Sequence, residues 1–185
     1  MTIYFLSSNH NKIKEVETIL TTKKIQVKPI GQKINEIQSE NMKNIAEDKA
    51  LKAYKLIGRP ILVEQTGLLI EKFGNLPGGL TQIFWDSLEA DKFSEFFSKN
   101  EETVAIAKTV LAYCDGKKVY TFDGEIKGNI IYPPKGNREF QWDCVFRPFG
   151  YDQTFAEMGA KKNEISMRKI ALEKLKIFLE EEYEY

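Results

Sequence analysis

The sequence is short of several residue types on which common functional sites depend. It holds one histidine, His10, and two cysteines, Cys114 and Cys144, in 185 residues. A single histidine excludes metal sites built from several histidines, and a histidine-assisted cysteine nucleophile is disfavoured because neither cysteine is near it in the sequence. Any metal is therefore expected to be held by oxygen ligands. The widely spaced cysteines are typical of reduced, packed thiols and indicate a cytoplasmic protein.

Charge of one sign and long apolar stretches are also missing. Lysine and arginine together number 27, as do aspartate and glutamate, so no long-range field favours nucleic acid or an acidic membrane. The first residues, MTIYFLSSNHNK, have no basic lead and too short an apolar run for a signal peptide. No stretch approaches the roughly 20 apolar residues of a membrane span. We therefore expect neither nucleic acid nor a membrane as partner.

The first half of the chain alternates between strand and helix patterns. Strands are predicted at 2–6, 25–30 and 61–70, and helices at 13–20 and 42–57. In the second helix Ile45, Leu51 or Lys52, and Leu56 stand at helical intervals. The continuous apolar start of the third strand is typical of a sheet that is covered on both faces. This alternation predicts an α/β fold.

The second half of the chain predicts a hairpin between helices. Residues 80–100 suit one helix or two short ones, and residues 103–114 and 118–131 read as strands joined at Asp115-Gly116, a strong hairpin signal. An irregular loop follows at 132–143, and a long helix is predicted at 162–183. With 42% hydrophobic residues, the chain suits a single domain, residues 1–185, with a substantial core.

A loop between the first strand and helix is the first candidate site. The segment SSNHNK carries Ser7, Asn9 and Lys12, whose side chains can donate to phosphate oxygens beside the positive end of the helix dipole. A helix cap with a surface lysine is the commoner explanation of such a segment by itself.

Two carboxylates form the second candidate. Glu36 and Glu64 each stand where a loop or a strand end can face a common cleft, and two carboxylates suit Mg²⁺, which prefers oxygen ligands. Solvated acidic residues are the plain alternative for both.

The remaining candidates lie in the second half of the chain. Phe140, Trp142 and Asp143 belong to an irregular loop, where an aromatic ring can stack on a purine and an acid can read its edge. Packing in the core is the commoner role of any one aromatic residue. The start of the last helix carries Lys161, Lys162, Ser166 and Arg168, which suit a phosphate or a base carbonyl, or simply a charged helix start.

Taken together and in this order, these segments resemble the inosine triphosphate pyrophosphatase family over nearly the whole chain. Ser7, Asn9, Lys12 and Glu15 fall on the family's T-x-N-x-x-K-x-x-E motif, Glu36 on its metal-binding glutamate and Lys52 on its phosphate-binding lysine. The other similar stretches are LVEQTGLLIEKFGNLPGG, FDGEIKGNI, EFQWDCVFRPFGYDQTFAEM and KNEISMRKIAL. The last two are long and specific.

The resemblance implies a function and a fold. It implies a hydrolase of acid anhydrides that uses Mg²⁺ to convert ITP, dITP or XTP to the monophosphate and pyrophosphate. The implied fold is an elongated mixed sheet flanked by helices, with two lobes around a nucleotide cleft, in a homodimer. The implied catalytic residues are Glu64, Gln65 and Lys12, and the implied metal ligands are Glu36 and Glu64. The implied substrate-binding residues are Ser7, Asn9, Lys12, Lys52, Phe140, Trp142, Asp143, Lys162, Ser166 and Arg168.

The sequence departs from the family pattern at a few positions. Gln65 stands at the family's second acid, Met167 at the histidine of S-H-R, and Cys144 at a proline. Glu139 and Gln141 replace both glycines beside Phe140 and remove backbone freedom near the base. These changes predict a shifted base preference.

Two other interpretations stay open. A catalytically silent nucleotide-binding or regulatory protein would keep the phosphate cleft, and Gln65 and Met167 favour it. An α/β protein with an unrelated small-molecule substrate would show no thermal shift with nucleotides.

Overall fold

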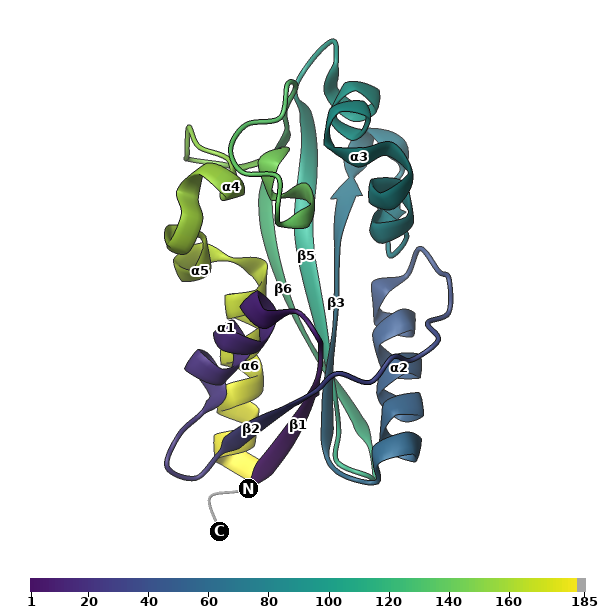
Figure 1. The fold of residues 1–185 in the computed structure, drawn as a ribbon, viewed down its shortest axis with the longest axis vertical. Coiled ribbons are helices and arrows are strands. Elements are labelled where there is room, and N and C mark those ends of the chain that lie inside the picture. Colours follow the sequence, from purple (N-terminus) through teal and green to yellow (C-terminus); the bar gives the residue numbers. More distant parts are fainter. Residues whose placement is uncertain (183–185) are drawn as a thin grey trace.

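One mixed sheet runs through the molecule. Within residues 1–182, which this computed structural model describes, seven strands form a sheet in the order β2-β1-β3-β5-β6-β7, with β4 paired to β3. Helices flank the sheet, and the molecule is elongated along the β5–β6 hairpin (Figure 1). The predicted α/β class with a long mixed sheet is confirmed. Positions 183–185 of the predicted domain, and the end of the predicted last helix, lie outside the described residues.

The elements follow the predicted alternation closely. The strands are β1 (Thr2–Leu6), β2 (Gln26–Ile30), β3 (Ile61–Ile70), β4 (Pro77–Gly78), β5 (Thr103–Cys114), β6 (Val119–Ile130) and β7 (Phe146–Pro148). The helices are α1 (His10–Leu20), α2 (Met42–Ile57), α3 (Thr81–Ser98), α4 (Phe155–Met158), α5 (Lys162–Ile165) and α6 (Met167–Glu182). Short 3-10 turns are η1 (Glu71–Phe73), η2 (Gln141–Cys144) and η3 (Gly159–Lys161). No helix in this range is long and apolar enough to cross a bilayer.

The order of the first three strands creates a place for a cleft. β1 pairs in parallel with β2 on one side and with β3 on the other, so the chain reverses its direction of winding at β1. The pairing with β3 covers just two positions, Tyr4 with Ile61 and Phe5 with Leu62. Beyond them the two strands part. Ligands of open α/β sheets bind at such points, outside the carboxyl ends of the strands.

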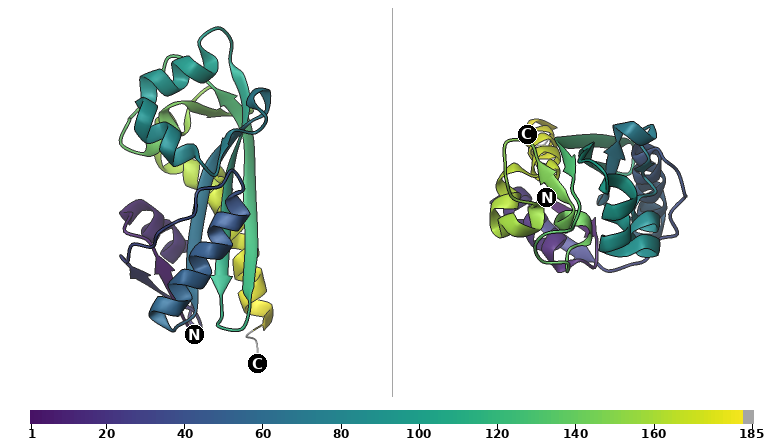
Figure 2. Two further views of the ribbon diagram at one scale, coloured as in Figure 1. Left: turned by 90° about the vertical axis from the view of Figure 1, so that its right-hand side faces the viewer. Right: turned by 90° about the horizontal axis from the view of Figure 1, so that it is seen from above.

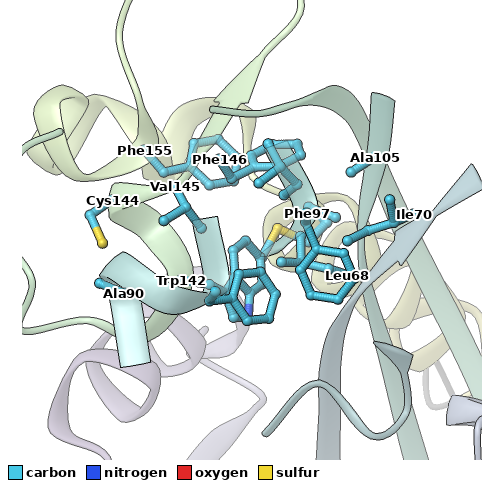
Figure 3. Close-up of a cluster of buried hydrophobic side chains, with 14 of the residues drawn as sticks. Leu68, Ile70, Ala90, Phe97, Ala105, Trp142, Cys144, Val145, Phe146 and Phe155 are labelled. Carbon is cyan, nitrogen blue, oxygen red and sulfur yellow. The ribbon is translucent and has the colours of Figure 1, made fainter. Parts of the chain in front are cut away.

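Alternate residues of β3 point to different helices. Leu62 packs in one buried cluster with residues of α1 and α6, whereas Val63 packs in another with residues of α2. A third cluster fills the other lobe, where α3, η2 and α4 meet the far ends of β3 and β5 around Phe97, Trp142 and Phe146 (Figure 3). Figure 2 shows the two lobes edge-on, joined by the long strands.

Helix α2 buries alanines where larger residues were expected. Leu51 and Leu56 are 49% and 56% exposed, so these members of the predicted helical repeat lie on the outer side. The inner face is formed by Met42, Ile45 and three alanines: Ala46, Ala50 and Ala53. Small side chains let the helix lie close to β3 and β5, which the apolar periodicity alone did not indicate.

The predicted last helix is broken, and the prediction of one helix at 162–183 is wrong in this respect. Ser166 separates α5 from α6 in an extended conformation (φ −66°, ψ 152°). Its hydroxyl accepts a hydrogen bond from the backbone N–H of Lys169 at 3.1 Å and so caps α6. The break puts Arg168 in the first turn of α6. The segment 80–100 forms α3, which is broken at Glu89 (φ 54°, ψ 179°), as the expectation of one or two helices allowed.

Gly124 of β6 allows α6 to lie directly on the sheet. A Cβ atom added there would come within 2.0 Å of the Met167 carbonyl oxygen and 2.9 Å of the Ala171 nitrogen. Since both contacts are with backbone, neither can move aside cheaply.

We therefore expect Gly124→Ala to lower the free energy of unfolding by about 1–3 kcal/mol, the usual cost of overpacking a core. Urea unfolding at neutral pH measures it. Gly31→Ala is the matched control, because a Cβ atom at Gly31 meets nothing within 4 Å. Equal stability of the two variants would contradict this account of the helix position.

Candidate functional site

The loop from β1 to α1 reaches the point where β1 and β3 part. Asn9 caps α1 by accepting a hydrogen bond from the Lys12 N–H at 3.1 Å, and the Ser7 hydroxyl accepts one from the Asn9 N–H at 3.2 Å. The cap that the sequence indicated is therefore present. It also directs Lys12 into the site, where its Nζ lies 3.0 Å from Glu64 Oε1.

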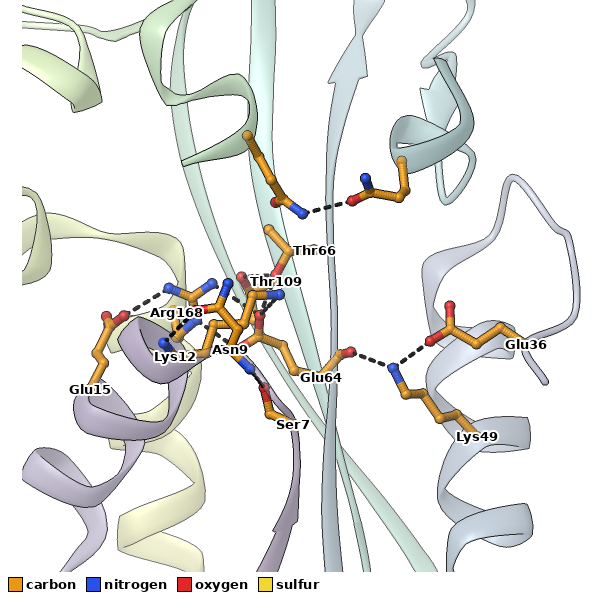
Figure 4. A network of polar contacts seen from close by, with 12 residues as sticks. Ser7, Asn9, Lys12, Glu15, Glu36, Lys49, Glu64, Thr66, Thr109 and Arg168 are labelled. Atoms are coloured by element: carbon orange, nitrogen blue, oxygen red, sulfur yellow. Dashed lines mark hydrogen bonds and ion pairs between the residues drawn. The ribbon is translucent and has the colours of Figure 1, made fainter. Parts of the chain in front are cut away.

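A buried network of charges surrounds Glu64. Arg168 donates to both oxygens of Glu64, at 2.6 and 3.0 Å, and to Glu15 Oε2 at 2.7 Å (Figure 4). Thr66 adds a hydrogen bond to Glu64 Oε1 at 2.8 Å. The carboxylates of Glu15 and Glu64 and the guanidinium of Arg168 are all buried. One arginine thus ties together β3, α1 and α6.

The network sets the charge of its members. Burial alone would raise the pKa of Glu64, but Arg168 and then Lys12 outweigh it and hold that pKa well below the ordinary 4.5. Burial would likewise lower the pKa of Arg168, but Glu64 and Glu15 raise it. Glu64 is therefore a permanent carboxylate at neutral pH.

Gln65 lies on the other side of the sheet. Successive residues of a strand point to opposite faces, so Gln65 shares the α2 side with Val63 while Glu64 faces α1 and α6. The Gln65 amide Nε2 donates to the backbone oxygen of Gly79, at 3.4 Å. Its side chain is buried.

The carboxylates of Glu36 and Glu64 do not contact each other; Lys49 bridges the two residues. Lys49 of α2 donates to Glu36 Oε1 at 2.5 Å and approaches the backbone oxygen of Glu64 at 3.5 Å (Figure 4). Lys52 bonds instead to the backbone of Asn35, at 3.0 Å. Among residues 1–182, no three His, Cys, Asp or Glu side chains lie close enough together to hold a metal ion.

The loop at residues 132–143, which carries Phe140, lines a cavity of about 480 Å³. Phe140, Asp143, Lys162 and Arg168 form part of its wall, with Glu15. The ammonium of Lys162 lies 2.6 Å from Asp143 Oδ2 and 4.3 Å from the centre of the Phe140 ring.

Burial raises the pKa of Asp143 and lowers that of Lys162, against the attraction between the two. Trp142 does not line the cavity. It is 3% exposed and packs against Phe146 in the third buried cluster, around Phe97. Ser166 lies beside the network, where its hydroxyl donates to Glu15 Oε1 at 3.1 Å.

Two residues of this site were not assigned a role from the sequence. Glu15 matches the family's opening motif, and that match is the signal in the sequence that could have assigned it. Lys49 gave none, since one further lysine in α2 is unremarkable. The geometry distinguishes it from Lys52, because Lys49 turns inward and the Lys52 side chain is 40% exposed.

The fold and the site define an α/β protein in which Arg168 joins a buried charge network, with Lys12 in it, to a cavity lined by Phe140. Comparison with known proteins agrees with this description. A family profile described as Ham1 family matches residues 3–178, and the chain belongs to the Ham1 family. The resemblance drawn from the sequence is thereby confirmed.

Named relatives and solved structures extend over nearly the whole chain. An inosine triphosphate pyrophosphatase of Yarrowia lipolytica is 37% identical over 187 residues, covering 100% of this chain and 98% of that protein. A dITP/XTP pyrophosphatase of Methanopyrus kandleri is 34% identical, covering 94% of each. The structure of a HAM1 protein from Coxiella burnetii has a TM-score of 0.83, at 24% identity, covering 98% of this chain and 99% of that one. This last likeness concerns the fold.

We expect Arg168→Met to lower the free energy of unfolding at pH 7 by about 3–5 kcal/mol, because two buried carboxylates lose the guanidinium that they share. The depressed pKa of Glu64 stabilises the wild type above the unfolded pKa, and this stabilisation is lost as the pH falls below about 4.5. The deficit of the variant should therefore shrink in acid.

Urea unfolding at pH 7 and at pH 4 measures both quantities. Arg147→Met, which removes a more exposed ion pair with Glu102, is the control and should cost little at either pH. A deficit for Arg168→Met that does not change with pH would contradict the assignment of the charges.

Proposed function

We propose that this protein hydrolyses a purine nucleoside triphosphate of the ITP, dITP or XTP kind, or one with an altered base, to the monophosphate and pyrophosphate. The observation that carries the proposal is Arg168. It binds the Glu64 carboxylate at the cleft and also lines the aromatic cavity, so that a base site and a phosphate site adjoin. The names of the relatives at 37% and 34% identity support the same reaction.

The triphosphate would lie where β1 and β3 part. Lys12 reaches this point from the first turn of α1, and Ser7 and Asn9 form the preceding loop. Lysine ammonium groups and the positive end of a helix suit phosphate oxygens. Lys52 keeps its proposed role from the family motif, and the inward position of Lys49 makes it an additional candidate.

The base would occupy the cavity. Phe140 offers a ring for stacking, and Asp143, Lys162, Ser166 and Arg168 offer polar groups beside it. Trp142 supports the same loop from within the core. Fixed donors such as Arg168 and Lys162 favour a base that presents a carbonyl oxygen, as hypoxanthine and xanthine do.

The donor set suits Mg²⁺ with substrate phosphates as further ligands. Glu36 and Glu64 supply carboxylate oxygens, and Mg²⁺ sites typically combine one or two carboxylates with phosphate and water. Both carboxylates are paired with cations, Glu36 with Lys49 and Glu64 with Arg168 and Lys12. The two lysines would have to turn toward the phosphates. When bound, the metal would neutralise charge on the phosphates.

The proton of the attacking water needs an acceptor. Gln65 can hold a water molecule but cannot accept a proton. Glu36 is the better acceptor of the two glutamates, because Arg168 and Lys12 hold the pKa of Glu64 well below its ordinary value. A positioned general base contributes ~10²–10⁴-fold, whereas enzymes gain ~10⁶-fold or more in all, so its loss leaves room for activity. The proposal also includes a homodimer and a cytoplasmic location, as in the sequence-based expectation.

A silent nucleotide-binding protein is the second candidate. The bond from Gln65 to the Gly79 backbone favours it, since the amide is engaged in holding the fold. Such a protein would bind a triphosphate and release no pyrophosphate.

We expect pyrophosphate release with Mg²⁺ from ITP or XTP, in preference to the four ordinary triphosphates and dUTP. A coupled pyrophosphate assay over this panel measures it. Glu36→Gln keeps the size of the side chain and removes its charge, and it should abolish turnover. Binding in calorimetry without any release would assign the silent role, and the absence of both would contradict a nucleotide site.

We expect Gln65→Asp to raise turnover, by at most ~10²–10⁴-fold, because it restores a proton acceptor at position 65, on the α2 side of β3 where Lys49 holds Glu36. Gln65→Asn has the same size as the aspartate variant without the charge, so it is the matched control and should give no increase. Equal rates for the two variants would show that position 65 needs no base.

A further inference from the structure

Gln141 has a backbone conformation that its side chain disfavours. Its φ is +43°, in the left-handed region that residues with a Cβ atom rarely adopt. The residue directly follows Phe140, which lines the aromatic cavity. A glycine would take this conformation freely. A glutamine persists in such a place when its surroundings hold it there.

The Gln141 side chain is held by α3. Its Nε2 donates to Gln82 Oε1 at 2.6 Å, and Gln82 in turn donates to Asp86 at 2.6 Å. On the other side of Phe140, Arg138 forms a bidentate ion pair with Asp91, at 2.5 and 2.9 Å. Two side chains that flank Phe140 are thus both fastened to one helix.

The two contacts, Gln141 with Gln82 and Arg138 with Asp91, involve different parts of α3. Gln82 precedes the break of α3 at Glu89, and Asp91 follows it. The loop is therefore attached to α3 at two separate points, each through solvent-exposed side chains. The ring between them also lies against the Lys162 ammonium, which pairs with Asp143. A shift of Phe140 would disturb the polar wall of the cavity as well.

We propose that Gln141 is a positioning residue, which together with Gln82 fixes Phe140 at the aromatic cavity and so sets the affinity for the base of the triphosphate. This inference rests on the function proposed above for the same site. It predicts a loss confined to the base, because the phosphate-binding lysines belong to α1 and α2 and touch neither glutamine.

The test compares two probes by calorimetry: ITP, which has base and phosphates, and inorganic tripolyphosphate, which has no base. Gln82→Ala removes the acceptor, and we expect ITP binding to weaken by about five- to tenfold, the equivalent of one hydrogen bond. Tripolyphosphate binding should stay within about twofold of the wild type. Gln141→Gly should act in the same way, since it frees the backbone beside Phe140.

Two further variants separate the hydrogen bond from general damage. Asp86→Ala removes the other partner of Gln82 and should leave ITP binding unchanged. Gln82→Glu combined with Asp86→Asn interchanges donor and acceptor in that second contact and keeps an oxygen for Gln141, so it should retain wild-type affinity.

The outcomes are distinct. An equal loss for both probes, or no loss for ITP, would overturn the role of Gln141 while the proposed function stands. If the wild type bound neither probe, both proposals would fail. Calorimetry measures binding without turnover. The effect of the Gln141 and Gln82 variants on ITP affinity is therefore expected to be the same in a silent nucleotide-binding protein as in an active enzyme.

Discussion

The contact of Arg168 with Glu64 and Glu15 is the interaction on which the site depends. It joins one strand and two helices that belong to distant parts of the chain, since Arg168 lies 104 residues from Glu64 and 153 from Glu15. Taking three charges out of water is costly, and the cost is offset here by several charge-assisted hydrogen bonds in good geometry. The lobe that carries the β1–α1 loop is therefore built around a network of paired charges, with Glu64 and Glu15 matched by Arg168 and Lys12, and not around apolar contacts alone.

Successive side chains of β3 point to opposite faces of the sheet, so adjacent residues have different surroundings. Glu64 faces the charged network and Gln65 faces the turn at Gly79, although they are neighbours in sequence. The site needs both faces, because β1 leaves β3 just before Glu64 and exposes an edge of the strand. At such an edge, groups from α1 on one face and from α2 on the other approach the same residue: Lys12 contacts the Glu64 carboxylate and Lys49 the Glu64 backbone oxygen.

The sequence predicted most elements, because each has a local signal. Runs of β-branched, aromatic and other apolar residues located the strands, and Asp115-Gly116 located the hairpin turn. It did not predict the break at Ser166, since an extended serine within a helical pattern is stabilised by contacts with Glu15 and α6 that form in the folded chain. The site was predicted as residues and motifs, whereas the bridging role of Arg168 depends on long-range packing. The inward turn of Lys49 likewise depends on how closely α2 approaches the sheet.

The close approach of α6 to β6 has a bearing on how this sequence can diverge. A side chain at Gly124 would meet the backbone of Met167, the residue before Arg168, so it would displace the start of α6 that carries the guanidinium. Gly124 is buried and bears no functional group. A substitution there would nonetheless reach the charge network around Glu64, because Arg168 lies in the first turn of the helix that Gly124 packs against.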